Sequence, residues 1–171
     1  DGTVLAIIAR GTAFDPLLGR GGAQFDATKF SWIGSANDEV SICTAWHTTP
    51  VNTFEDLTRT EMIVGGTGGS ADTDQFPRVL NGVFGTKMKV ISGYPGGNDI
   101  NLAMERGEVH GRGSNSWMGW KATRPEWLTD KKINILVQIG LKKDPEIGDV
   151  PLLMDLAKND EDRAVLRLLS A

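Results

Sequence analysis

The residues best suited to bind a small molecule lie in two glycine-rich loops, the first being Gly65 to Ser70. Glycine backbones let a ligand approach closely, and several N–H groups of such a turn can point at one anion beside a helix N-terminus. The hydroxyls of Thr67 and Ser70 add two more donors, and Gly65 and Gly68 belong to the same turn. This chemistry favours the capture of a negatively charged molecule.

The second loop, residues 92–99, also joins a predicted strand to a predicted helix. Its candidate ligand contacts are Tyr94, Gly96, Gly97 and Asn98. Open α/β sheets bind ligands at the carboxyl ends of their parallel strands. We therefore expect the two loops to form the two walls of one anion pocket.

Three acidic residues, Asp72, Asp74 and Asp99, fall in the first turns of the helices that follow these loops. Acids at such positions stabilise the helix dipole by themselves, so capping is their simplest role. An acid here would also bind an amine of the ligand or repel a second carboxylate. Asp72 is therefore included among the candidate ligand contacts.

The first loop also fits a dinucleotide-binding fingerprint, Gly66-x-Gly68-x-x-Ala71. That fingerprint requires an acid about 20 residues further on to hold the ribose. The strand end at residues 90–93 contains none. A nucleotide-dependent enzyme with residues 66–71 as its phosphate loop is therefore the alternative to a binding protein.

Residues for catalysis or metal binding are scarce. Histidine is the residue type best suited to act as a general base at neutral pH, and the two in this sequence, His47 and His110, have neither the spacing of a catalytic triad nor that of metal ligands. The single cysteine, Cys43, lies in an apolar run and is typical of a buried inert thiol. We expect no catalytic residue, no metal site and no cofactor.

Regular β-loop-α units must position the two loops. We predict strands at residues 62–64, 88–91 and near Val109, with helices at 74–84 and 99–106 between them. Asn98 is the expected N-cap of the second helix, and Gly107 the glycine that ends it. Such repetition predicts a parallel sheet with helices on its faces.

Outside this region, apolar runs predict further strands. They span residues 3–9, 29–34, 40–46 and 133–139. Residues 152–169 form a helical tail, as one helix or as two broken near Asn159. The tryptophans Trp117, Trp120 and Trp127 either pack between lobes, cover the cleft or contact the ligand.

Composition excludes several partners. The net charge of −4, with a pI near 5.2, gives no reason to bind a phosphate backbone, so we expect no nucleic acid. No apolar run approaches the roughly 18 residues of a membrane-spanning helix.

Several motifs follow one another in a characteristic order. The glycine-serine loop is followed by Gly93-Tyr94-Pro95-Gly96-Gly97 and by Glu105-Arg106-Gly107-Glu108-Val109. Asp1-Gly2-Thr3-Val4-Leu5 and Asp149-Val150-Pro151 flank this run. Together these motifs resemble the periplasmic receptors of tripartite tricarboxylate transporters, known as the Bug family.

The resemblance implies an α/β chain like the type II periplasmic-binding proteins, with two lobes of mainly parallel sheets and flanking helices, lobe one being incomplete. Part of lobe one and the hinge would span residues 1–50. The core of lobe two, with the ligand loops, would span 51–115. The rest of lobe two, the hinge return strand and the C-terminal helices would span 116–171.

The resemblance also implies a function, which is capture of a small carboxylate for a tripartite tricarboxylate-type transporter. The ligand would be a di- or tricarboxylate, an aromatic acid or an amino acid, and the membrane permease subunits would be the partners. Gly65, Thr67, Gly68 and Ser70 would hold one carboxylate. Tyr94, Gly96 and Gly97 would line the second wall. The location would be periplasmic, although the sequence shown has no signal peptide, and the inducer-binding domain of a transcription regulator shares the fold and stays open.

The sequence departs from the family pattern in ways that leave the ligand's identity open. The first loop is one residue shorter, Asp72 and Thr73 replace a usual histidine, and His110 replaces a usual acid. Family chains are also much longer, so we expect this chain to be an internal stretch. Produced alone, residues 3–9 would lack a neighbouring strand, which favours a dimer or a swapped assembly.

Overall fold

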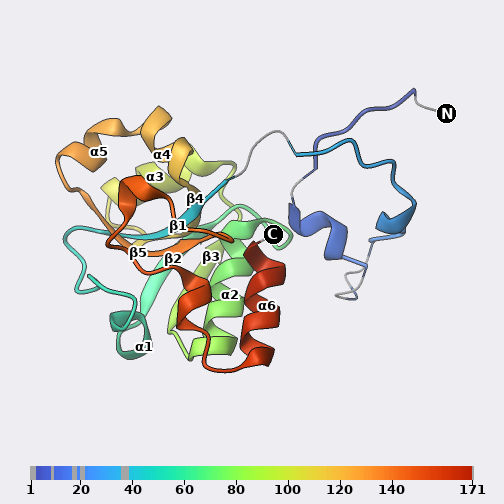
Figure 1. The fold of residues 1–171 in the computed structure, drawn as a ribbon. Coiled ribbons are helices and arrows are strands. Elements are labelled where there is room, and N and C mark those ends of the chain that lie inside the picture. Colours follow the sequence, from blue (N-terminus) through green and yellow to red (C-terminus); the bar gives the residue numbers. More distant parts are fainter. Residues whose placement is uncertain (1–2, 9, 17–18, 20–21, 36–38, 171) are drawn as a thin grey trace.

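The computed structural model describes residues 3–8, 10–16, 19, 22–35 and 39–170. A five-stranded sheet of order β3-β2-β4-β1-β5 forms its centre (Figure 1). The strands are β1 (Ser41–Trp46), β2 (Met62–Gly66), β3 (Met88–Ser92), β4 (Gly111–Ser116) and β5 (Ile133–Ile139). β2 pairs with β3 and β4 in parallel, whereas β1 is antiparallel to β4 and β5. The predicted α/β class with a mainly parallel sheet is confirmed.

Helices cover both faces of this sheet, and Figure 1 shows the two layers on opposite sides of the strands. One layer contains α1 (Asp56–Arg59), α2 (Asp72–Phe84) and α6 (Asp160–Ser170). The other contains α3 (Gly97–Glu105), α4 (Trp117–Thr123) and α5 (Pro125–Thr129). Each layer has its own apolar cluster, so the sheet is buried on both faces, as strands with parallel neighbours usually are.

An apolar stripe holds α2 against the sheet. Phe76, Leu80 and Phe84 recur every four residues, and all three are buried against the sheet. Gly85 ends the helix in the left-handed conformation at φ 69°, where a side chain would be strained.

Two local predictions in the β-loop-α region were wrong. Helix α3 begins at Gly97 with Gly96 as its N-cap, so Asn98 is not the cap. The strand expected near Val109 begins only at Gly111. It is formed by the run Gly111–Ser116, which contains no apolar side chain that could have predicted it. Gly107 does follow α3 with a positive φ of 73°, as predicted.

The two strands predicted at residues 3–9 and 29–34 do not form in the described residues. Residues 3–8 have no strand partner and are exposed, Ile7 completely so. Lys29 closes the short 3-10 helix η2 (Ala27–Lys29), and residues 30–35 are irregular. An apolar run becomes a strand only where a neighbour accepts its backbone hydrogen bonds. Residues 1–2 and 9 of the predicted motifs lie outside the described residues.

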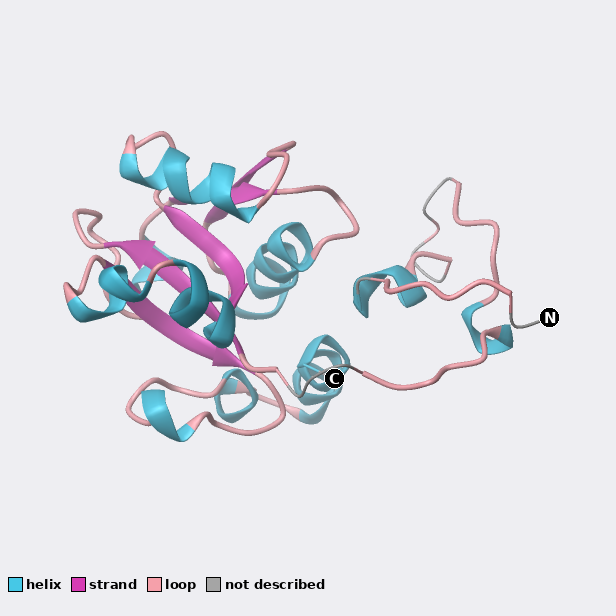
Figure 2. Cartoon of the chain, turned by 90° about the horizontal axis from the view of Figure 1, so that it is seen from above, coloured by secondary structure: helices cyan, strands magenta, loops and turns pink. Residues whose placement is uncertain are grey.

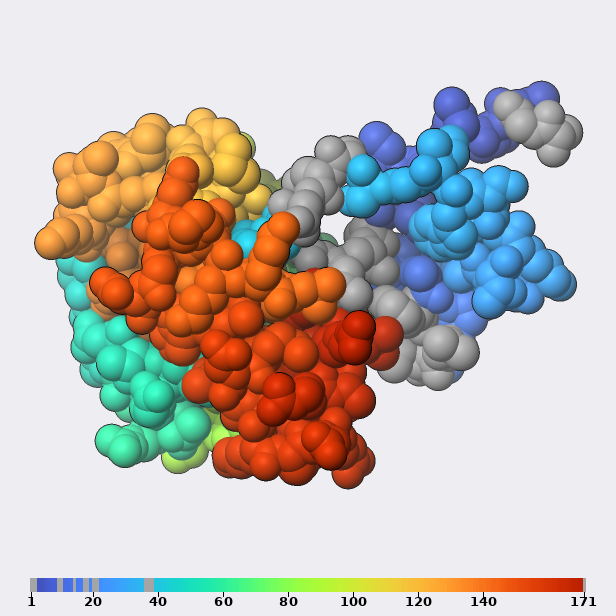
Figure 3. Space-filling view, in the orientation of Figure 1, coloured from blue at the N-terminus to red at the C-terminus, as the bar shows by residue number. Residues whose placement is uncertain are grey.

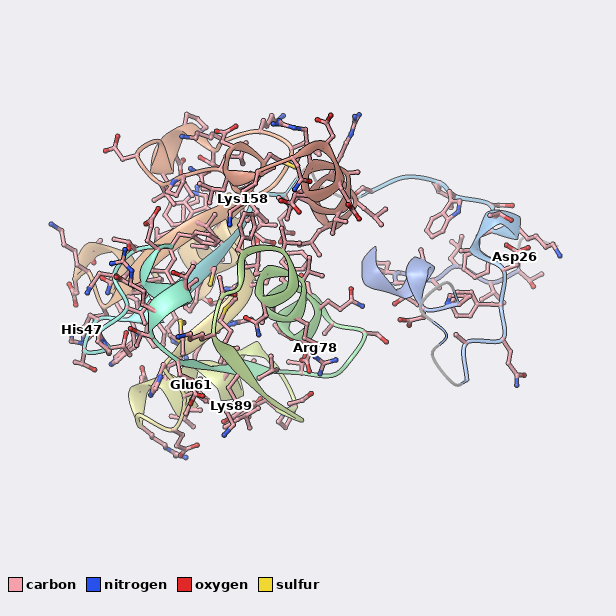
Figure 4. The ribbon with its side chains drawn as sticks, turned by 90° about the horizontal axis from the view of Figure 1, so that it is seen from below. Asp26, His47, Glu61, Arg78, Lys89 and Lys158 are labelled. Atoms are coloured by element: carbon pink, nitrogen blue, oxygen red, sulfur yellow. The ribbon has the colours of Figure 1, made fainter. Side chains whose placement is uncertain are left out.

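The N-terminal segment, residues 3–35 as far as they are described, lies beside the sheet domain. Figures 2 and 3 show it to one side of the body formed by the rest of the chain. Figure 4 labels Asp26 within this segment, far from the strands. The segment also contains the 3-10 helix η1 (Arg10–Phe14), which lies against the start of α2.

The C-terminal tail is broken, as one of the two predictions had it. The 3-10 helices η3 (Pro145–Ile147) and η4 (Leu153–Leu156) precede α6, which begins at Asp160. Leu166 anchors α6 in the core. Within the described ranges, no helix is both long enough and apolar enough to cross a bilayer.

Candidate functional site

The two glycine-rich loops meet at one edge of the sheet. β2 and β3 run in parallel with Gly66 opposite Ser92, so both strands end at the same level. The amides of Gly93 and Tyr94 both donate to the carbonyl oxygen of Gly66, at 3.0 and 3.1 Å. The expectation that the loops lie side by side is confirmed, whereas the ligand contacts assigned to them remain predictions.

The first loop uses its amides within the chain. Thr67 N donates to the Thr73 hydroxyl at 3.1 Å, and Gly68 N donates to the Asp74 carboxylate at 3.1 Å. Asp74 is completely buried and also pairs with Arg78 at 3.5 Å. Figure 4 labels Arg78 on α2, whose first turn supplies both acceptors. To bind a ligand, these two amides would have to leave partners that they already have.

Two glycines of the first loop are required for packing. A Cβ on Gly65 would lie 2.6 Å from Cγ2 of Ile100, and one on Gly66 would overlap the Asp74 carboxylate. Both residues are buried. Gly68 instead has open space around its Cα but a φ of 154°, which side chains disfavour. The predicted contact of a ligand with Gly65 would therefore need the loop to open.

Ser70 already holds a carboxylate. Its hydroxyl donates to Oδ2 of Asp15 at 2.9 Å, which ties the N-terminal segment to the first loop. Gln75 reaches the Ser70 carbonyl oxygen at 3.2 Å, and Gly11 lies against both residues. A side chain here would collide with them, so Gly11 allows the close approach.

The second loop leaves its helix N-terminus open. Gly97 and Asn98 are the first residues of α3, and the first amides of a helix have no intrahelical acceptor. Neither amide donates a hydrogen bond to the part of the chain that the structure describes. The N-cap Gly96 has no side chain to cap them, and Asp99 is exposed. These amides and the dipole of α3 favour an anion.

Arg112 is the residue that sequence reasoning missed. β4 runs beside β2 with Gly111 opposite Val64, which brings Arg112 to the level of the two loops. Its side chain is only 6% exposed. Nη1 donates to Oδ1 of Asn101 at 3.2 Å and to the carbonyl oxygen of Gly97 at 3.4 Å.

A buried guanidinium changes the electrostatics of this edge. Burial lowers the pKa of Arg112 to about 10, and the negative charge of Asp72 acts in the opposite direction. The group is therefore still positively charged at neutral pH. Asp72, a predicted ligand contact, begins α2 directly after the first loop. It is close enough for its negative charge to act on the guanidinium. A lone arginine between two glycines belongs to no recognisable motif. Only the knowledge that its strand is buried on both sides could have identified it as a candidate.

His110 and Cys43 have structural roles. Nδ1 of His110 accepts from the amide of Ile63 at 3.2 Å, which ties β4 to β2. Burial raises the pKa of the Cys43 thiol to about 12, which makes it unreactive. Trp117, Trp120 and Trp127 are all buried in the apolar cluster under α3, α4 and α5. Among the described residues, no three His, Cys, Asp or Glu side chains are grouped as metal ligands.

Solved structures share this fold. A TctC solute-binding protein from Polaromonas, solved with no ligand, is 18% identical and has a TM-score of 0.67 over 95% of this chain and 60% of its own. MatC from Rhodopseudomonas palustris with bound malate is 14% identical, with a TM-score of 0.65 over 86% of this chain and 49% of its own. The periplasmic binding protein BugD is 14% identical, with a TM-score of 0.57 over 75% and 42%.

The neighbours include a solute-binding protein and a periplasmic binding protein, and the periplasmic-binding-protein-like fold expected from the resemblance is confirmed. This chain spans about half the length of those proteins. No family model matches the sequence, and no curated protein does.

Proposed function

We propose that this chain is part of a periplasmic solute-binding protein that captures a small carboxylate for a tripartite tricarboxylate-type transporter. The observation that carries this proposal is the open N-terminus of α3 at the junction of the two loops, with Arg112 buried beside it. Backbone amides and a guanidinium are strong donors to a carboxylate. The bound malate of MatC is in accord with this ligand class.

Binding without chemical change fits these residues better than catalysis does. The site offers donors, a helix dipole and a positive charge, which suit the binding of an anion, and neither His110 nor Cys43 is placed to act on a ligand there. His110 is engaged by β2, and Cys43 is buried on the far face of β1. The protein in this proposal is therefore a receptor and not an enzyme.

The nucleotide alternative is disfavoured by the first loop. A phosphate loop presents free amides to the phosphates, but Thr67 N and Gly68 N are engaged by α2. In our proposal the ligand carboxylate lies on the second loop, at Gly96, Gly97 and Asn98. Tyr94 lines its side, and the first loop with Thr67, Ser70 and Asp72 forms the opposite wall.

The proposal extends to partners and location. The membrane permease subunits of the transporter would receive the ligand, and the protein would act in the periplasm. Residues 1–50 would contribute part of lobe one and the hinge, 51–115 the core of lobe two with both loops, and 116–171 the rest of lobe two with the return strand.

Calorimetric titration of the chain tests the proposal. The panel is acetate, succinate, malate, citrate, benzoate and glutamate, with NAD and ATP as competing ligand classes. We expect at least one carboxylate to bind with a Kd in the micromolar range and both nucleotides to give no heat. Binding of a nucleotide without any carboxylate would overturn the proposal, and so would the absence of binding by any carboxylate.

A further inference from the structure

Four buried side-chain groups beneath the second loop make no hydrogen bond with the described residues. They are Thr44 Oγ1, Arg112 Nε, Ser114 Oγ and Trp120 Nε1. Arg112 and Ser114 alternate along β4 and so point to the same face of the sheet. Thr44 on β1 lies opposite Arg112 on β4. The centroid of the Trp120 ring lies 5.5 Å from the guanidinium carbon of Arg112. The four groups therefore belong to one region, between the sheet and helices α3 and α4.

All four groups can act as donors, and two of them can do nothing else. Arginine and tryptophan N–H groups only donate, while the hydroxyls of Thr44 and Ser114 donate or accept. A buried donor without an acceptor costs free energy, and native proteins leave few of them. The partner that would satisfy this region is an acceptor that the described residues do not supply.

The guanidinium of Arg112 has one edge engaged and one edge open. Nη1 is bonded to Asn101 and Gly97. Nε and Nη2 form the other edge, and Nε has no hydrogen-bond partner among the described residues. This edge matches the two oxygens of a carboxylate, which can accept both N–H groups side by side.

The electrostatics also call for an anion. The Arg112 nitrogens lie 2.9 Å from where a Cβ of Gly97 would be, so the cation abuts the positive end of the α3 dipole. Among the described residues, Asp72 supplies the opposing charge that acts on the guanidinium. The buried cation and the helix dipole together favour an anion, while the negative charge of Asp72 limits how much negative charge the site accepts, so a singly charged carboxylate fits better than a doubly charged phosphate.

We propose that Arg112 anchors a carboxylate group of the ligand through its Nε–Nη2 edge, with Ser114 and Trp120 as supporting donors. This inference rests on the proposed function and deepens it, because it names the charged residue that selects carboxylates at the second loop. Arg112 then determines specificity, because backbone amides alone would not provide this selectivity for carboxylates.

The test is calorimetry of the Arg112→Gln variant with whichever of succinate, malate or citrate binds the wild-type chain most tightly. We expect the Kd to rise about 10- to 100-fold, as for loss of a charged hydrogen bond. Arg124→Gln is the matched control, because Arg124 lies 5.6 Å over the ring of Trp127 in the same kind of contact but is bonded to Thr123. The control should bind like the wild type.

Ser114→Ala keeps the test decisive if Arg112→Gln does not fold. It removes a buried hydroxyl that has no partner, so the free chain should be as stable as the wild type or more so, while the Kd rises about fivefold. If Ser114 had only a structural role, the substitution would not raise the Kd while leaving the stability unchanged or higher.

A spectroscopic readout reports on the site directly. In nitrogen-15-labelled protein the five tryptophans give indole N–H resonances, and Trp120→Phe identifies that of Trp120. The carboxylate should shift this resonance in the wild type, while inorganic phosphate at equal concentration should not. If the carboxylate binds but neither Arg112→Gln nor Ser114→Ala weakens it, and the resonance does not move, the inference is overturned while the proposed function stands. If no carboxylate binds the wild type, the proposed function fails, and the inference fails with it.

Discussion

The two loops are alike in sequence but differ in what their amides do. In the first loop, Thr67 and Gly68 donate to side chains in the first turn of α2, and Asp74 supplies the negative charge. In the second loop, the amides of Gly97 and Asn98 begin α3 without an acceptor among the described residues. The cation Arg112 lies beside them. In this chain the glycine-rich turn before α2 is a structural joint because the helix carries its own buried acid, whereas the turn before α3 leaves its helix N-terminus open to an anion.

The largest expected effect tests the structural character of the first loop. Asp74→Ala removes a completely buried carboxylate and leaves Gly68 N and Arg78 without their acceptor. We expect the free energy of unfolding to fall by about 3 kcal/mol, as measured by urea denaturation. Asp99→Ala, the exposed acid in the first turn of α3, should cost less than about 1 kcal/mol. Equal losses would remove the distinction between the loops.

A second pair of substitutions separates packing from binding. Gly65→Ala forces a Cβ against Ile100 and should lower the free energy of unfolding by about 2 kcal/mol. Gly97→Ala pushes on the flexible end of Arg112, so stability should change by less than about 1 kcal/mol. The Kd for the best carboxylate should nevertheless rise about tenfold, as for loss of one good hydrogen bond. Urea denaturation and calorimetry on both variants check this, and the reverse pattern would contradict it.

A third change tests the contact between the first loop and the N-terminal segment. Ser70→Ala removes the hydrogen bond to Asp15 and should cost about 1 kcal/mol or less. Trypsin should then cut faster after the exposed Lys29, while residues 41–170 stay intact. Thr58→Ala, which removes a surface hydroxyl bond within α1, is the control. Unchanged cleavage in Ser70→Ala would show that the contact does not hold the segment.

The smallest expected effect is a pH dependence at the helix that carries Trp120. Hydrogen bonds from Lys121 and Trp117 lower the pKa of Glu146, which joins η3 to α4. The native state then binds fewer protons than the unfolded state. The stabilising contribution of Glu146 is therefore fully present above its unfolded pKa of about 4.5. It is lost as the pH falls through the lower native value. Glu146→Gln should therefore show a smaller loss of stability than the wild type between pH 6 and pH 3.5 in urea denaturation.

The part of the fold that the sequence predicts well is the region from Met62 to Glu105. Its strands and helices alternate with clear apolar spacing, and Gly85 and Gly107 mark helix ends through positive φ values. Because neighbouring parallel strands end at one edge, the meeting of the two loops could be inferred without coordinates. Local pattern and tertiary structure agree in this region.

The sequence fails where tertiary neighbours decide the outcome. The apolar run 3–9 predicts a strand, but its described residues 3–8 join no strand of the sheet. β4 is polar and still forms a strand, because β2 and β1 lie on both sides of it. Arg112 was missed for the same reason. It contacts Trp120 and Asn101, and no local pattern around Arg112 predicts either contact.

The reversed strand β1 has a consequence for how the chain reaches its native state. It is the first strand in the sequence, yet it lies between β4 and β5, whose residues come from the second half of the chain. During synthesis, Ile42, Cys43 and Ala45 emerge long before either neighbour exists. Such distant pairing slows folding and leaves apolar surface uncovered in the meantime. We therefore expect these apolar residues to stay uncovered until Ile139 has left the ribosome.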